Sequence, residues 1–226
     1  ATPTSSDQDF GFYASMDFGD LPDEYYTTLA SEGAYHTVSE LSLGDAPDAE
    51  GDGAPDPLAG MTRYGSTGGN DNAGSSDEDG VNRVISDYWT PNVDVQLRIT
   101  VTGGTGRVVG WFDWDDDDQF DEMIDFGELS GNSQTVTVRT PGTYTSQTPV
   151  NARFRLFDPE NLPGGSLDDG DYLGAAIGGE VEDYHWEFGP TAVHLTSLQA
   201  TAPSFIGIGI LTAVVILSGL KSKIRP

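Results

Sequence analysis

The residues best suited to chemistry are the acids within residues 111–128, whose side chains are of the kind that binds metal ions. This stretch contains seven Asp and two Glu, and it has no Lys or Arg. Carboxylates this close in the sequence repel one another, so a compact loop made from them requires a positive charge at its centre. A hard divalent cation meets this requirement. We expect Ca²⁺ before Mg²⁺, because Ca²⁺ accepts about six to eight oxygen ligands in an irregular cage.

The spacing of these acids resembles the opening of many calcium-binding loops. An EF-hand would place Gly at the sixth position of the loop and Glu at the twelfth, and this chain has Asp118 and Ile124 there. The sequence therefore predicts a calcium loop on a β scaffold and not an EF-hand. The alternative is a solvated acidic turn that binds no ion. The candidate ligands in this stretch are Asp113, Asp115, Asp117, Gln119, Asp121 and Glu128.

The composition limits the partners and the compartment of this protein. Its 226 residues include 37 acids and 10 bases, which gives a formal net charge of −27. Such a chain repels phosphates, so nucleic acid is excluded as a partner, and docking of its acidic part onto anionic lipid is disfavoured. The charge fits an extracellular protein that uses divalent cations to offset its own repulsion. The chain has no Cys, so bound metal is the cross-link left to it.

The sequence motifs of the common enzyme classes are missing, so we expect no catalytic activity. The three histidines lack the spacing of metal ligands, and no Cys nucleophile, GxSxG motif or phosphate-binding loop is present. Paired carboxylates could hydrolyse glycosides, but acids this frequent place some pair at any separation. The four Trp could stack on sugars, although such residues more often lie in the core of a β-sandwich. Carbohydrate binding is therefore kept as an alternative.

Alternating apolar and polar residues predict an all-β domain. A turn at the glycines of residues 103–106 should separate two strands, the second of which delivers the acidic loop. The last expected strand carries acids on both faces, so at least one acid should point into a loop cluster instead of bulk water. We expect one antiparallel β-sandwich, of jelly-roll or immunoglobulin-like type. The expected strands are residues 34–43, 93–102, 107–114, 134–140, 150–157 and 179–188.

The C-terminal part of the chain predicts a membrane anchor. Residues 204–220 contain no charge, and a helix of this length reaches roughly 25 Å, the short end for crossing a bilayer. Three cations follow within residues 221–226, which places the C-terminus in the cytoplasm and the bulk of the chain outside the cell or in the periplasm. A buried core helix is the alternative. Residues 189–203 are uncharged and form an extended spacer.

Several motifs together resemble the GEVED domain, a family of bacterial cell-surface proteins. The motifs are the acidic turn at 17–25 with the cluster at 43–53, the acids at 77–81, the loop at 110–120, and Gly-Glu-Val-Glu-Asp-Tyr at 179–184. The resemblance covers residues 17–188 and implies an extracellular β-sandwich with an adhesive or structural role. Residues 1–16 precede it as an arm that begins with Ala, from which we expect a processed N-terminus.

The resemblance also implies that the acidic motifs bind metal, and it extends the set of candidate ligands. In the family the loop usually reads Asp-Phe-Asn-Gly-Asp-Gly-Asp, and this chain has Asp116 and Asp118 in place of the two glycines. Glycine readily adopts the left-handed backbone of a tight turn, so these two aspartates bear on whether the loop can turn as it does in the family. The further ligands implied are Asp45, Asp48, Glu50, Asp52, Asp77, Asp79, Glu180, Glu182 and Asp183.

The function expected from these features is that of a calcium-binding β-sandwich anchored in the cell membrane by residues 204–220. We expect an accessory or structural subunit of a membrane or cell-surface assembly that binds protein partners. The alternative is an adhesin-like or carbohydrate-binding surface module. A chain with one module and one helix is short for a long-reach adhesin, which favours the subunit.

Overall fold

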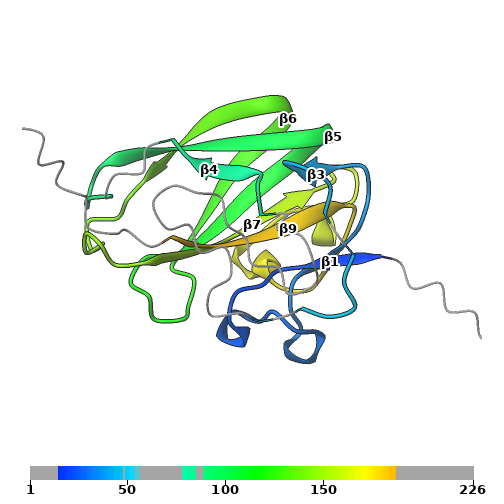
Figure 1. Ribbon diagram of the computed structural model, residues 1–226, viewed down its shortest axis with the longest axis horizontal. Helices are drawn as coiled ribbons and strands as arrows, with labels where there is room; N and C mark the ends of the chain where they lie inside the picture. The colour runs from blue at the N-terminus through cyan, green and yellow to red at the C-terminus, as the bar shows by residue number, and fades with distance from the viewer. Residues whose placement is uncertain (1–14, 48, 54, 56–77, 85–88, 187–226) are drawn as a thin grey trace, which may run out of the picture. The chain divides into compact units, whose positions relative to one another are not determined.

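The computed structural model describes residues 15–47, 49–53, 55, 78–84 and 89–186 (Figure 1). This part of the chain forms strands and short 3-10 turns, so the prediction of an all-β fold is confirmed. None of its helices is long and apolar enough to cross a membrane. The predicted membrane helix at 204–220 lies outside the described residues. The strands are β1 (Met16–Phe18), β2 (Tyr35–Thr37), β3 (Ser42–Leu43), β4 (Val81–Arg83), β5 (Asp94–Asp113), β6 (Glu122–Arg139), β7 (Val150–Phe157), β8 (Ala175–Ile177) and β9 (Gly179–Trp186).

The larger sheet is organised around the long hairpin of β5 and β6. Its order is β3-β5-β7-β9, and β4 and β6 also pair with β5, all antiparallel. The first half of β5 has β3 and β4 on one edge, and its second half has β7 there. β6 follows the opposite edge of β5 through both halves.

The predicted turn at residues 103–106 is wrong, because β5 runs through these residues as a bend. Hydrogen bonding to β6 resumes after a register shift between Val101 and Thr105, so the pair curls without ending. Gly103 has a φ of 78°, and a Cβ there would lie 1.6 Å from the carbonyl oxygen of Glu40. The bend therefore requires glycine at this position.

The bend lets the two halves of β5 contribute to one hydrophobic core. Leu97 and Ile99 from the first half and Phe112 from the second half are fully buried in the same cluster as Phe154 of β7 and Trp186 of β9. All four Trp are buried, as expected for core residues of a β-sandwich. The curled antiparallel sheet is thus confirmed, and its jelly-roll or immunoglobulin-like type stays a prediction.

A second, three-stranded sheet contacts the other face of β7 and β9. Its order is β1-β2-β8, and β2 pairs with β8 in parallel, which contradicts the expectation of a purely antiparallel fold. The single strand predicted at 34–43 is also wrong. It is divided into β2 in this small sheet and β3 in the large one. Figure 1 shows β1 running beside β9.

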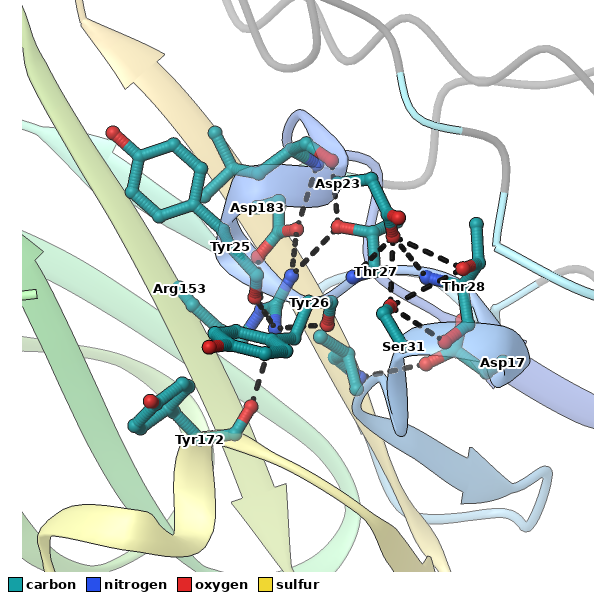
Figure 2. Close-up of polar contacts among 12 residues, drawn as sticks. Asp17, Asp23, Tyr25, Tyr26, Thr27, Thr28, Ser31, Arg153, Tyr172 and Asp183 are labelled. Carbon is teal, nitrogen blue, oxygen red and sulfur yellow. Dashed lines mark hydrogen bonds and ion pairs between the residues drawn. The ribbon is translucent and has the colours of Figure 1, made fainter. Parts of the chain in front are cut away.

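Two buried arginines of β7 join these layers. Arg153 Nε and Nη2 each donate to the Asp183 carboxylate at 2.8 Å, and Nη1 donates to the carbonyl oxygens of Tyr25, Tyr26 and Tyr172 at 3.0–3.2 Å (Figure 2). Both side chains of the Arg153–Asp183 pair are fully buried. Because a buried charge is tolerated only when it is paired and hydrogen-bonded, these contacts fix the N-terminal segment on the sheet.

Arg155 makes the equivalent connection one pleat away. Its Nε donates to Nε2 of the buried His36 at 3.0 Å, and its Nη1 donates to the carbonyl oxygens of Asp171 and Leu173. Burial, together with the nearby charge of Arg153, lowers the pKa of Arg155 to about 9. Burial and the Arg155 charge hold the pKa of His36 well below its usual value, so the imidazole is neutral and accepts this hydrogen bond.

Candidate metal centre

The acidic loop lies between the end of β5 and the start of β6 and is shorter than expected. β6 begins at Glu122, so the loop proper is residues 114–121 and the later acids of the motif belong to a strand. β5 ends on Asp113, whose side chain is fully buried. The hairpin thus places one carboxylate beneath a loop whose other acids face solvent.

The Asp113 carboxylate organises the loop above it. Its Oδ1 accepts hydrogen bonds from the backbone N–H of Asp115 at 3.1 Å and of Asp116 at 2.7 Å. Its Oδ2 accepts from the Asp118 N–H at 3.1 Å and from the Tyr25 hydroxyl at 2.5 Å. These hydrogen bonds hold the backbone of the loop and the Tyr25 hydroxyl on the buried Asp113 carboxylate at the floor of the loop.

The two positions where the family pattern has glycine adopt left-handed backbone conformations. Asp116 has a φ of 61° and Asp118 a φ of 66°. Asp is among the few residues that tolerate this region, because its short polar side chain hydrogen-bonds locally. The turn geometry of the family loop is therefore compatible with this sequence despite the missing glycines.

Three acids of the loop are close enough to hold one metal ion. Asp113, Asp115 and Asp117 each offer a carboxylate oxygen, and these oxygens lie within 4.8 Å of one another. Within the described ranges no other group of three acids or histidines meets this condition. The set consists of hard oxygen donors with a combined negative charge, which fits Ca²⁺ with water completing its shell.

The electrostatics of the loop favour a bound cation. Partial desolvation and the charges of Asp121, Asp117 and Asp113 raise the pKa of Asp115. Desolvation and the charge of Glu24, followed by those of the loop acids, likewise raise the pKa of Asp118. Mutual repulsion thus opposes full ionisation of the loop, and a divalent cation would relieve it.

The other candidate ligands of this motif lie at different distances from the three acids. Gln119 is adjacent, and its backbone N–H and side-chain amide donate to the Asp117 carboxylate at 3.2 and 3.4 Å. Asp121 accepts from the Trp114 N–H at 2.8 Å and lines a cleft of about 380 Å³ together with Asp115. Glu128 lies on β6 opposite Arg107, roughly 20 Å along β5 from Asp113. The structure therefore keeps Glu128 apart from the loop.

The candidate ligands in the N-terminal half of the chain make contacts away from the acidic loop. The Asp45 N–H donates to the Asp79 carboxylate at 2.8 Å, and the Asp52 carboxylate accepts from the Leu29 N–H at 2.7 Å. Glu50 forms an isolated β-bridge with Met16. None of these acids joins the loop of residues 114–121 in a common group of ligands within the described residues. The candidates Asp48 and Asp77 lie outside the described residues.

The acids of β9 are buried and bind protein groups directly. Glu180 accepts from the Leu43 N–H, and Glu182 accepts from the N–H groups of Asp79 at 2.9 Å and Gly80 at 2.7 Å. Asp183 pairs with Arg153 on the opposite face. The expectation that at least one acid of this strand avoids bulk water is confirmed, since all three are buried. These contacts attach β3 and the start of β4 to the sheet, and metal ligation by these three acids stays a prediction.

Glu182 gives the fold a dependence on pH. Burial first, and then the charge of Asp79, raises the pKa of Glu182 to about 8. A carboxyl whose folded pKa lies above its unfolded value of 4.5 stabilises the fold below pH 4.5, and this stability is lost as the pH rises through 8. His36 acts oppositely, because stability is lost as the pH falls below 6.5. Above pH 6.5 His36 therefore no longer changes the stability, and the loss of stability caused by ionisation of Glu182 is left.

We expect the free energy of unfolding to fall between pH 6.5 and 8.5, with a slope of at most about 1.4 kcal/mol per pH unit. The variant Glu182→Gln should flatten this slope, because glutamine keeps an acceptor oxygen for the amides and does not titrate. Urea unfolding of the unaltered protein and of the variant, at several pH values and in the presence of a chelator, measures the two slopes. Equal slopes would contradict the assignment to Glu182.

Sequence reasoning missed a hydrogen-bond chain that supports the loop. Asn151 of β7 donates through Nδ2 to the Tyr25 hydroxyl at 2.8 Å and to the Asp116 carboxylate at 2.9 Å. Its Oδ1 lies 2.6 Å from Nδ1 of His185 on β9. Asn151 alternates with apolar residues as Arg153 and Arg155 do, which is typical of a solvent-facing side, and its partners come from segments distant in sequence.

A comparison with known protein families supports the resemblance of this chain to the GEVED domain. The model of this domain matches residues 107–186, which run from the second half of β5 to the end of β9 and include the acidic loop. No curated protein and no solved structure matches the chain.

Proposed function

We propose, with the match to the GEVED domain as the premise, that this chain is a non-catalytic calcium-binding module of a membrane or cell-surface assembly. The observation that carries the proposal is the convergence of Asp113, Asp115 and Asp117 at the end of β5. Calcium there would neutralise the loop and hold it on the buried Asp113. The ion would thus stabilise structure and would activate no substrate.

The contacts of Asp113 explain why such an ion would matter beyond the loop. Tyr25 donates to Asp113, and the backbone of Tyr25 also accepts from Arg153. The loop, the N-terminal segment and β7 are therefore connected through a few polar groups. Neutralising the loop would stabilise all three elements together, which is the role of a cross-link in a chain without cysteine.

The proposed setting is the outside of the cell, with residues 204–220 as a single membrane anchor and the C-terminus in the cytoplasm. The uncharged run of residues 204–220, the basic residues that follow it and the net charge of −27 support this placement. We propose an accessory or structural subunit that associates with membrane partners. Detergent extraction followed by native size measurement tests this part: migration with other membrane proteins supports it, and a lone chain contradicts it.

Calcium titration by isothermal calorimetry tests the metal site. The full chain in detergent should bind Ca²⁺ at one site or more, and Mg²⁺ more weakly, because Mg²⁺ demands a small octahedral site. The variant Asp117→Asn should remove one site. The control Glu160→Gln neutralises an exposed acid beyond the opposite end of β7 and should leave binding unchanged. Absence of calcium binding, or equal binding by the two variants, would contradict the proposal.

A further inference from the structure

Among the strands of the described residues, β6 has an unpaired edge that the metal centre does not use. In the part of the chain that the structure describes, β6 pairs with β5 and with no other strand. Figure 1 shows it along the rim of the larger sheet. The N–H and C=O groups along such an edge are a template on which another strand can add.

The second half of this edge lacks the features that normally prevent strand addition. Residues 129–138 contain no charged residue and no Pro, although 37 of 226 residues in the whole chain, about one in six, are acidic. Ser133, Thr135 and Thr137 are exposed on the outer face, and Thr has a high preference for strands. Edge strands in soluble proteins usually carry Lys, Pro or an inward-pointing charge to block pairing.

We propose that this edge pairs with the same edge of a second copy of the chain, in an antiparallel arrangement with two-fold symmetry. Two chains that each carry a charge of −27 repel each other, so a contact between copies must exclude acids, and residues 129–138 do so. A two-fold interface uses the same surface patch on both copies, which an antiparallel pair of identical strands satisfies. The resulting sheet continues from one copy to the other.

The ends of the edge have complementary charges. Glu128 precedes the uncharged run and Arg139 ends it, so antiparallel pairing places the acidic end of one strand near the basic end of the other. Arg139 donates to Asp94 at 2.8 Å within its own copy, but both side chains are 61% exposed. Such a pair contributes little to stability and leaves the guanidinium accessible to a second carboxylate.

The absence of cysteine allows a direct test by disulfide formation in the full chain in detergent. A single Cys is introduced at Ser133, Thr135 or Thr137, and in a control at the exposed Thr145, which lies outside β6. With Glu128 of one copy near Arg139 of the other, the two-fold axis passes close to Ser133, which then lies near its own copy, within the roughly 4–7 Å between Cα atoms that a disulfide spans. We expect its covalent dimer yield under mild oxidation to exceed that of the control at least fivefold.

A second variant measures the affinity without a covalent bond. Ser133→Lys places like charges near each other across the proposed pair, because Ser133 lies close to the two-fold axis, and Thr145→Lys adds the same charge elsewhere. In sedimentation experiments Ser133→Lys should raise the dimer dissociation constant at least tenfold over that of Thr145→Lys. A monomeric chain, equal effects of the two lysines, or equal disulfide yields at all four positions would overturn the proposal. These results would leave the calcium proposal untouched.

Discussion

The variant Asp183→Asn is expected to lower the free energy of unfolding by about 3–5 kcal/mol, the usual effect of removing one partner of a buried ion pair. Arg153 and Asp183 are fully buried, and the Arg153 guanidinium would remain there without a counter-ion. The Leu21 N–H, which donates to Asp183 at 2.8 Å, would also face a weaker acceptor. A loss of this size is a large share of the stability of a typical domain.

The control for this variant is Asp94→Asn. Asp94 also accepts from an arginine at 2.8 Å, but both side chains of that pair are 61% exposed. Exposed ion pairs contribute up to about 1 kcal/mol to stability, so the free energy of unfolding of this variant should differ from that of the unaltered protein by no more than this amount. Urea unfolding of both variants gives the comparison. Equal stability of the two would mean that the buried pair does not hold the N-terminal segment.

Removal of calcium is expected to lower the melting temperature by roughly 5–10 °C. A ligand present at about 100 times its dissociation constant stabilises the folded state by about 2.7 kcal/mol, and each kcal/mol shifts the melting temperature of a domain of this size by about 2–4 °C. The effect follows from the proposal that the cation binds the folded loop and not the unfolded chain. Thermal unfolding followed by circular dichroism, with calcium and then with chelator, measures it.

The variant Asp117→Asn should abolish this calcium dependence. Asp117 is exposed, and its carboxylate accepts hydrogen bonds from the neighbouring Gln119, so its loss leaves the rest of the fold in place. Asp113 is a poorer choice, because its carboxylate also holds the loop backbone and Tyr25. Glu160→Gln should melt with the same calcium dependence as the unaltered chain. Calcium dependence that persists in Asp117→Asn would place the ion elsewhere.

The strands predictable from the sequence are those whose alternation reflects one buried face. Residues 150–157 and the strand that begins at residue 179 were placed correctly, because Val150, Phe154 and Trp186 point into one core. The sequence predicts a turn where β5 bends, since three glycines in four residues are equally typical of a turn and of a bend. Nothing local indicates that β6 follows β5 around the bend.

The polar half of the structure was less accessible to sequence reasoning. Arg153 and Arg155 alternate with apolar residues and have the pattern of a solvent-facing side, yet residues far away in the sequence cover them. The sequence predicts the acids of β9 as metal ligands, and it gives no sign of their contacts with backbone amides and Arg153. The loop acids Asp113, Asp115 and Asp117 were predicted to lie together because their spacing is local.

A crystal structure grown in calcium, with anomalous diffraction data, tests the metal centre most directly. The account predicts an anomalous peak among Asp113, Asp115 and Asp117, about 2.3–2.6 Å from at least one oxygen of each carboxylate. Density for water alone at this position, with the three carboxylates turned apart, would contradict it.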